Sequence, residues 1–435
     1  VERSRAPQFS AHTRRQLSLA PPNFPLWDGT GVFVDFKRVE LEATFDVRAQ
    51  KVMVKAKVAF AQTEPGYPLA DLKAVPTRVA INGDELPRGS FSAVSDPDKE
   101  SRYRALRREL EPGHHELELE YELTEGVKWL DGGVFFSSYM GDLDPPGFSE
   151  QFFPSNLEYD QYASHLTLHV VGADHVPRVL SNGAMTERRD RDRTTYAISM
   201  PEWYNTASLY LQIHNPSKYA LASRTVRGMN GDTPVTAVVR QGPAADGKLR
   251  DALDVSEKAM LELERQLGPF PHQGYIVSLG GIGGMEHSGA TRTSIEALSH
   301  ETCHQWIARG ALPAGGNHGW FDEGLASWRD DGYPRPDSVT LEGDYPKLSG
   351  FSPYRRHTPR ASYSHGADVM GELDFVFRDH GGLLGQLRDF MELHVHQTYT
   401  TEMLLSFLAS RWPSKTPFSA RQYFDAKVYG KTALI

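Results

Sequence analysis

The segment ALSHETCHQWIARG, residues 297–310, places His300 and His304 four positions apart, with Glu301 directly after the first histidine. On an α-helix, residues i and i+4 lie on one face about 5–6 Å apart, so both imidazoles can bind one ion. Glu301 lies about 100° round the helix from His300, where it can contact a water on that ion without binding the ion itself. This is the H-E-x-x-H pattern, in which two histidines hold zinc and the glutamate acts as general base.

A third ligand is needed before this pattern predicts a metal site, because a solvated helix face carries the same spacing by chance. The segment GGNHGWFDEGLASW, residues 315–328, is predicted to be a helix that buries its apolar side chains on one side. Its Glu323 lies 19 positions after His304. A carboxylate on such a helix completes a tetrahedral site and leaves one position for water. We therefore predict one Zn2+ per chain, held by His300, His304 and Glu323.

Three neighbours of these residues have two interpretations each. Cys303 adjoins His304 and is either a further metal ligand or a buried core thiol, which is the commoner use of a free cysteine. Asp322 and His318 either orient the zinc-bound imidazoles by hydrogen bonds or have ordinary surface roles. The spacing alone leaves these alternatives open.

The elements that must position these residues divide the chain near residue 218, in HNPSKYALAS. From about residue 30 to 215, stretches such as RVELEATFDVRAQKVMVKAKVAF and HHELELEYEL alternate apolar and polar residues, which predicts strands. We interpret this half as an antiparallel β domain with one face packed and the other solvated. The expected organisation is an N-terminal extension at 1–25, a β-rich domain at 26–217 and a catalytic domain at 218–435.

The second half has mainly helical patterning. Apolar residues recur with helical spacing in six segments: 249–271, 295–309, 318–330, 362–379, 382–395 and 400–412. Between these, residues 331–361 are rich in Pro, Gly, Ser and Asp and predict a long loop.

Length and composition limit the classes of protein to which this chain can belong. The chain has 435 residues, of which 39% are hydrophobic and 24% charged, and its formal net charge is −9. This length predicts two or three domains. The negative balance argues against a nucleic-acid partner, which needs clustered lysines and arginines. No apolar run reaches the roughly 18 residues that cross a bilayer, and the single cysteine excludes an internal disulfide.

The first residues favour a processed chain. They begin with Val rather than Met, and VERSRAPQFSAHTRRQ carries four arginines in its first fifteen residues without an apolar signal region. We expect that an upstream signal or anchor has been removed, which favours a periplasmic or secreted location. A cytoplasmic location stays open, because one cysteine does not report on the redox compartment.

Four ordered motifs resemble those of the gluzincin zinc aminopeptidases, the family of aminopeptidase N and the leukotriene-epoxide hydrolase. The first is H-E-x-x-H, followed after eighteen residues by E inside WFDEGLA. GGIGGMEHSGA (280–290) is similar to the family's G-x-M-E-N segment, SYSHGADVM (362–370) to its Y-x-K-G-A stretch, and FFPSNLEYDQ (152–161) to its F-P-x-x-D-E-P region. The resemblance implies an α+β multidomain fold, in which an N-terminal antiparallel β domain, saddle-like or sandwich-like, precedes a thermolysin-like, mainly helical zinc catalytic domain.

The resemblance also implies roles for individual residues. Glu301 is expected to be the general base, and Tyr363 to donate a hydrogen bond to the oxyanion of the transition state. Glu286 is expected to pair with the free α-ammonium of a peptide, because such a charge pair selects the N-terminus. The further substrate-binding residues are Gly283, Gly284 and Met285, in a strand that a peptide can approach and extend, and Glu150 and Gln151, as a second amine contact. The implied function is a zinc aminopeptidase acting on peptides with a free N-terminus.

Two departures from the family keep other functions open. His287 stands where the G-x-M-E-N segment has Asn. About 215 residues of catalytic domain leave no room for the large C-terminal helical domain of many relatives, so we expect a more open site. A related gluzincin endopeptidase or epoxide hydrolase is one alternative, and a catalytically inactive peptide-binding homologue is another. Against the inactive homologue, the expected ligands, base and tyrosine are all present.

Overall fold

The computed structural model describes residues 9–130, 132–280 and 283–431. The chain divides into two compact units. The N-terminal unit holds the described residues up to Met140 together with Gly147–Pro216. The C-terminal unit holds Gly141–Pro146 and the described residues from Ser217 onward. The short segment Gly141–Pro146 therefore belongs to a unit that is remote from it in sequence, which no sequence pattern indicated.

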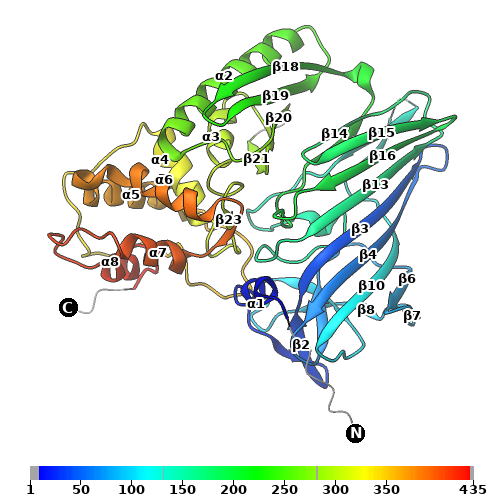
Figure 1. Cartoon of the computed structure of the whole chain (residues 1–435), viewed down its shortest axis with the longest axis horizontal. Helices are drawn as coiled ribbons and strands as arrows, with labels where there is room; N and C mark the ends of the chain where they lie inside the picture. Colours follow the sequence, from blue (N-terminus) through cyan, green and yellow to red (C-terminus); the bar gives the residue numbers. More distant parts are fainter. Residues whose placement is uncertain (1–8, 131, 281–282, 432–435) are drawn as a thin grey trace. The chain divides into compact units, whose positions relative to one another are not determined.

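The described part of the N-terminal unit contains a short helix, α1 (Ala11–Leu17), the 3-10 turn η1 (Ser149–Gln151) and three sheets. In Figure 1 the long strands β3, β4, β10, β13 and β16 of the largest sheet run side by side. The five-stranded sheet has the order β1 (Phe24–Leu26), β2 (Gly29–Phe33), β5 (Tyr67–Ala70), β9 (Arg102–Leu106) and β8 (Phe91–Ser95). The eight-stranded sheet has the order β15 (Ala184–Asp190), β16 (Arg193–Met200), β13 (Ala163–Val171), β3 (Asp35–Asp46), β4 (Lys51–Gln62), β10 (Gly113–Glu122), β6 (Arg78–Ile81) and β7 (Asp84–Glu85). The four-stranded sheet has the order β11 (Val127–Leu130), β12 (Gly133–Ser137), β17 (Leu211–His214) and β14 (Arg178–Ser181).

Alternation in the sequence accounts for the burial of the large sheet. Along β3, Val39, Leu41, Ala43 and Phe45 are buried, and the residues between them are half-buried or exposed. Successive side chains of a strand point to opposite faces, so one face packs and the other meets water. The pairings are antiparallel, as predicted, except that β13 pairs with β3 and β5 with β2 in parallel. More than a hundred residues separate β3 from β13, and a parallel pair requires such a long connection.

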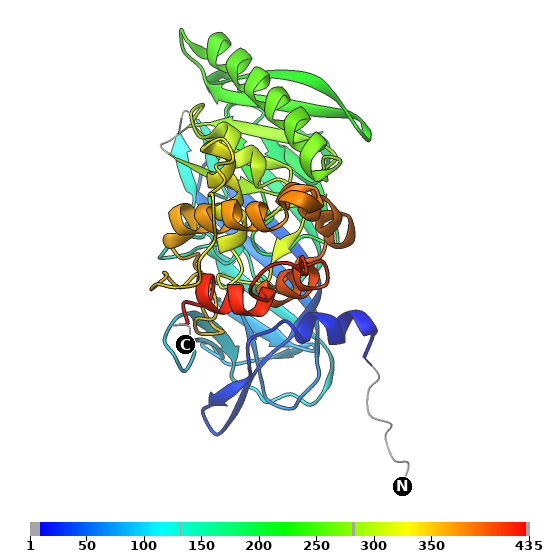
Figure 2. The same cartoon turned by 90° about the vertical axis from the view of Figure 1, so that its left-hand side faces the viewer.

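The C-terminal unit begins with a five-stranded sheet that the helical patterning did not indicate. Its order is β18-β19-β20-β22-β21, so β21 is an edge strand. Helix α2 lies across β18 and β19 in both views (Figure 1; Figure 2). The elements are η2 (Pro216–Lys218), which begins at the boundary, β18 (Tyr219–Gly228), β19 (Gly231–Arg240), α2 (Ala245–Leu267), β20 (Tyr275–Leu279), β21 (Gly284–His287), β22 (Ala290–Thr293), α3 (Leu298–Cys303), β23 (Leu312–Pro313), α4 (Trp320–Asp330), α5 (Ala361–Val376), η3 (Arg378–His380), α6 (Gly382–His394), β24 (Thr398–Tyr399), α7 (Thr401–Ala409) and α8 (Ala420–Lys427).

The sequence of α2 explains both why this segment is helical and where the helix ends. Leu249, Leu253, Met260 and Leu267 recur at helical spacing and are buried along one face. The helix ends at the next residue, Gly268, whose φ of 96° is readily adopted only by glycine. The predicted helix at 249–271 is therefore present, and it begins and ends four residues earlier than expected.

The predicted helix at 295–309 is wrong in length, because α3 covers Leu298–Cys303 only. After it, the backbone N–H groups of Gln305 and Trp306 donate to carbonyls three positions earlier, in tighter turns. Ala308 then has a φ of 127°, which no helix tolerates. The sequence conceals this break, because apolar residues continue across it. The other predicted helices are present as α4, α5 with η3, α6 and α7, whereas α8 was not predicted.

The core of the C-terminal unit forms beneath the helices that carry the predicted ligands. Trp306, Trp320 and Trp328 are each at most 1% exposed and belong to one continuous apolar cluster. These indoles fix the segments around His304 and Glu323, because close-packed interiors leave bulky side chains one arrangement. Across the described residues, no helix has both the length and the apolar character needed to cross a membrane.

Candidate active site

The three predicted metal ligands converge in the structure. Nε2 of His300 lies 3.3 Å and Nε2 of His304 lies 3.6 Å from Oε2 of Glu323. Zinc ligands at 2.0–2.1 Å in tetrahedral geometry lie about 3.3 Å from one another. The donor atoms of the three residues are all within 4.8 Å of each other, so the set fits a zinc ion without rearrangement of the backbone. The ligand roles themselves stay a prediction.

The pKa values of the two imidazoles are shifted in opposite directions. Burial opposes protonation of His300, but hydrogen bonds to Asp330 and Glu323 outweigh it and raise the pKa of His300 to about 10. Burial lowers the pKa of His304 to about 3, so this ring is neutral. A proton on His300 thus offsets the charge of Glu323, and a metal ion that binds there must displace that proton.

A close approach of two helices places Glu323 and Tyr363 together. A Cβ added to Gly324 of α4 would lie 2.9 Å from the backbone of Gly366 on α5, and one added to Gly366 would lie 3.1 Å from Gly324. Only glycine at both positions lets the helices approach this closely. One result is that the hydroxyl of Tyr363 donates to Oε1 of Glu323 at 2.8 Å. The oxyanion role of Tyr363 stays a prediction, and here its hydroxyl contacts a metal-ligand candidate.

Asp330, rather than Asp322 or His318, contacts the outer nitrogen of a predicted ligand imidazole. Asp330 Oδ2 lies 2.7 Å from Nδ1 of His300, and sequence analysis missed this residue. Asp330 follows Glu323 by seven positions, two helical turns, so the spacing placed both on one face of α4. Asp322 lies 3.9 Å from Nδ1 of His304, which is too long for a hydrogen bond. His318 instead accepts from the backbone N–H of Thr401 at 3.1 Å, away from the ligands.

Glu301 is buried against the edge strand. It is 5% exposed, and its Oε2 has no hydrogen-bond partner among the described residues. A Cβ on Gly284 would lie 2.1 Å from Oε1 of Glu301, so this glycine provides the space for the carboxylate. Gly284 was expected to admit a peptide, and its close neighbour is the predicted base instead. Burial and then the charge of Glu286 raise the pKa of the Glu301 carboxyl well above its ordinary value.

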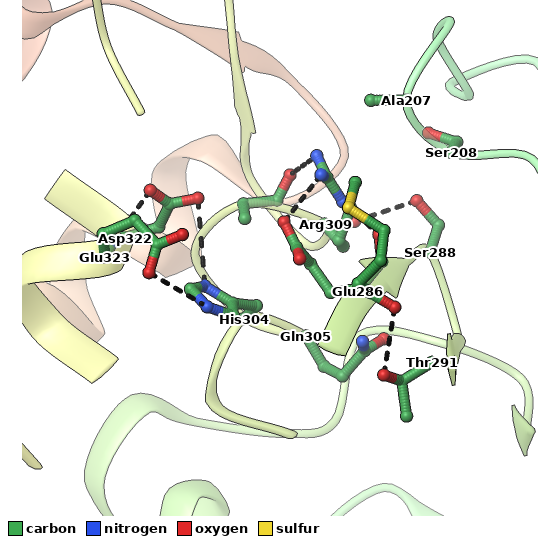
Figure 3. A network of polar contacts seen from close by, with 12 residues as sticks. Ala207, Ser208, Glu286, Ser288, Thr291, His304, Gln305, Arg309, Asp322 and Glu323 are labelled. Carbon is green, nitrogen blue, oxygen red and sulfur yellow. Dashed lines mark hydrogen bonds and ion pairs between the residues drawn. The ribbon is translucent and has the colours of Figure 1, made fainter. Parts of the chain in front are cut away.

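Glu286 lies on β21 and forms a buried ion pair that the sequence did not indicate. Nη2 of Arg309 donates to Oε1 of Glu286 at 2.7 Å, and Nε of Arg309 donates to the backbone carbonyl of Glu286 at 3.1 Å. Figure 3 shows this guanidinium beside Glu286, and the ring of His304 in contact with the carboxylates of Asp322 and Glu323. Donor atoms of Glu286, His304 and Asp322 also lie within 4.8 Å of one another. The carboxylates of Glu286, Asp322 and Glu323 therefore all lie close to His304 and form one acidic group.

Asp142 joins this acidic group, and sequence analysis missed it as well. It belongs to Gly141–Pro146, the segment that packs into the C-terminal unit, and its carbonyl accepts from the N–H of Thr358 at 3.0 Å. Burial and the charges of Glu286 and Glu323 raise the pKa of Asp142 to about 7. No local pattern could have found it, because its neighbours in space lie more than 140 residues away in sequence.

The remaining predicted residues divide between the units. Gly283 has a φ of 82°, a conformation that favours glycine, and Met285 is buried. Glu150 and Gln151 belong to the N-terminal unit, where the Glu150 carboxylate accepts from the N–H of Phe148 at 2.8 Å. Their role as amine contacts stays a prediction.

Two residues that adjoin predicted site positions are buried. His287, in place of the family's asparagine, is 1% exposed. Cys303 is in the apolar core, and burial raises the pKa of its thiol to about 12. Its thiol is therefore protonated at neutral pH, as expected of a core residue rather than a metal ligand.

Comparison with solved structures identifies the fold. The M1 zinc metallopeptidase of Deinococcus radiodurans is 17% identical, with a TM-score of 0.63 over 92% of this chain and 94% of that one. A mutant of that protein with a Tyr-Ser-Ala substrate matches at 16% identity, TM-score 0.63, over 92% and 95% of the two chains. Aminopeptidase A of Legionella pneumophila, with aspartic acid bound, matches at 14% identity and TM-score 0.68, over 92% of this chain and 50% of that one. No family model and no curated protein matches the sequence. The chain thus has the two-domain fold of M1 zinc metallopeptidases, which confirms the predicted fold.

Proposed function

We propose that the chain is a zinc-dependent aminopeptidase, which removes N-terminal residues from peptides. The observation that carries the proposal is the convergence of three donor atoms, from His300, His304 and Glu323, at tetrahedral spacing within a larger group of buried carboxylates. Buried carboxylates stay ionised only beside positive charge. A zinc ion and the α-ammonium of a peptide would together supply that charge. The shared fold supports this proposal.

Each step of hydrolysis has a candidate residue in the C-terminal unit. When bound, zinc supplies Lewis acidity, which makes water nucleophilic near neutral pH. Glu301 accepts the proton of the attacking water and delivers it to the leaving amine, and its raised pKa suits a group that must both take up and release a proton. Tyr363 donates a hydrogen bond to the substrate carbonyl as negative charge builds there. Burial and the charge of Glu323 raise the pKa of the Tyr363 hydroxyl far above its ordinary value, so it stays a donor.

Two carboxylates in the same acidic group would recognise the amine. Glu286 presents its carboxylate from the edge strand β21, to which a peptide can add as a further strand. Asp142 is close enough for Glu286 to raise its pKa. An α-ammonium between them would offset both charges, and a peptide with a blocked N-terminus would not. Recognition of the N-terminus would thus follow from charge.

The proposal is tested with a panel of aminoacyl fluorogenic substrates, each beside its N-acetylated counterpart, with and without a zinc chelator. We expect cleavage of the free-amine compounds only, abolished by the chelator and restored by added zinc. The matched control is Glu296→Gln, which changes an exposed glutamate four residues before His300 and is expected to have no effect. Equal or better cleavage of the acetylated set would favour an endopeptidase, in which the ion pair with Arg309 already satisfies Glu286.

A further inference from the structure

Arg309 contacts Glu286 at two points, and this contact has no counterpart in the expected chemistry of the site. Its side chain is 4% exposed, and Glu286 is 6% exposed, so the pair is shielded from water. One guanidinium nitrogen binds the carboxylate and another binds the backbone carbonyl of the same residue. Such a two-point contact restrains both the backbone of the edge strand and the rotamer of the glutamate.

The turn that carries Arg309 begins at a predicted metal ligand. The N–H of Arg309 donates to the carbonyl of His304 at 3.0 Å, and the N–H of Ala311 donates to the carbonyl of Trp306 at 2.7 Å. Between them, Ala308 has a φ of 127°, a conformation that costs an alanine about 1–2 kcal/mol. The strained turn aims the Arg309 side chain back at β21. His304 and Glu286, which lie on different elements, are thereby connected through six residues of chain.

Arg309 also offsets the negative charge of the buried Glu286 carboxylate. Glu286 is buried, and its carboxylate lies within 4.8 Å of ligand atoms of His304 and Asp322, so a second buried carboxylate is among its neighbours. A buried carboxylate in such surroundings, without a partner, would take up a proton or turn away. The ion pair engages Oε1 of Glu286 and places a guanidinium charge beside this carboxylate.

We propose that Arg309 is a positioning residue that sets the distance and orientation of the Glu286 carboxylate relative to the metal ligand His304, and so enforces selection of the peptide N-terminus. This inference rests on the proposed function. It assigns to Arg309 a specificity role, not contact with the reacting atoms. An arginine is required because a lysine ammonium cannot hold the carboxylate and the carbonyl of one residue together in a planar fork.

The test compares Arg309→Met and Arg309→Lys with the unaltered protein on free-amine and N-acetylated substrates. For Arg309→Met we expect at least a tenfold loss of preference for the free amine, arising from a higher KM while kcat changes by only a few-fold. Arg309→Lys is expected to be intermediate. The matched control, Arg421→Met, removes an exposed arginine that pairs with Glu402 in the same unit, and should leave the preference unchanged. A merely structural role would instead lower kcat for the free-amine substrates as much as kcat/KM, with KM unchanged.

A second readout does not depend on turnover. Binding of leucine amide, a free α-amine, is measured by calorimetry on zinc-free protein, in which its amide bond is not hydrolysed, and Arg309→Met should weaken this binding about tenfold. If Arg309→Met does not fold, Arg309→Lys decides both measurements. An unchanged or increased preference in the folded variants overturns the inference and leaves the proposed function intact. If the unaltered protein itself shows no preference for the free amine, the proposed function fails first.

Discussion

The proposed active site has two ends that are built differently, a metal end and an amine end. At the metal end, His300 and His304 come from a single turn of chain and Glu323 from the next helix, α4, so neighbours in sequence supply most of the geometry. At the amine end, Glu286, Arg309 and Asp142 come from an edge strand, a strained turn and a remote segment. The donor atoms at the metal end converge on one point. At the amine end, buried carboxylates lie beside one buried arginine. Changes at the first should therefore alter turnover and metal content, and changes at the second should alter selectivity.

The largest expected effect is at the metal end. Glu301→Gln removes the proposed proton acceptor while keeping the size of the side chain, and we expect kcat to fall by about a thousandfold. Zinc content, measured by atomic absorption, should not change, because Glu301 is not among the converging donors. Glu296→Gln is again the control. Retention of more than a tenth of the activity by Glu301→Gln would remove this residue from the role of base.

A large loss of stability is expected where the helices meet. In Gly324→Ala the new methyl group would lie 2.9 Å from the backbone of Gly366, which cannot give way as a side chain can. We expect the free energy of unfolding to fall by about 2–3 kcal/mol, together with activity, since the Tyr363–Glu323 contact depends on this crossing. Gly385→Ala in α6, where a Cβ meets nothing within 4 Å, should be neutral or stabilising. Similar unfolding curves for both variants would contradict the packing argument.

A smaller effect is expected from the partner that orients His300. Asp330→Asn keeps the shape of the side chain but removes the charge beside Nδ1 of His300. Outer partners of this kind contribute about 10–100-fold in metal affinity, and we expect the lower end of that range because Asp330 is partly exposed. Competition for zinc with a chromogenic chelator measures the change. Selectivity for the free amine should not shift, which distinguishes this variant from the Arg309 variants.

The smallest effect is a stabilisation at the amine end. Ala308→Gly relieves the positive φ of residue 308, although glycine gains freedom in the unfolded chain. We expect the relief of backbone strain to outweigh this entropic loss, so that the free energy of unfolding rises by up to about 1 kcal/mol. Thermal unfolding followed by circular dichroism checks the sign, and the substrate preference reports whether Arg309 keeps its position. A lower unfolding temperature would show that the alanine methyl group contributes packing that outweighs its strain.

Much of the fold was predictable because it depends on local periodicity. Alternation along β3 and helical spacing along α2 place apolar residues on one face, and burial of that face selects the element. The five-stranded sheet of the C-terminal unit was not predicted, and α3 ends at Cys303, six residues before the end of the predicted helix at residue 309. The pattern of apolar residues does not report a single strained residue such as Ala308.

By itself the sequence determined the donor set at the metal end, because the i, i+4 spacing of His300 and His304 and the Glu323 helix carry their geometry with them over short distances. It also held a signal for Asp330, which follows Glu323 by seven residues and therefore lies on the same face of α4. Only the tertiary structure decided the amine end. Asp142, Glu286 and Arg309 have no common spacing, and their meeting depends on which carboxylates are buried together and which cation offsets them. Buried charge is a property of the packed interior, so no linear pattern records it.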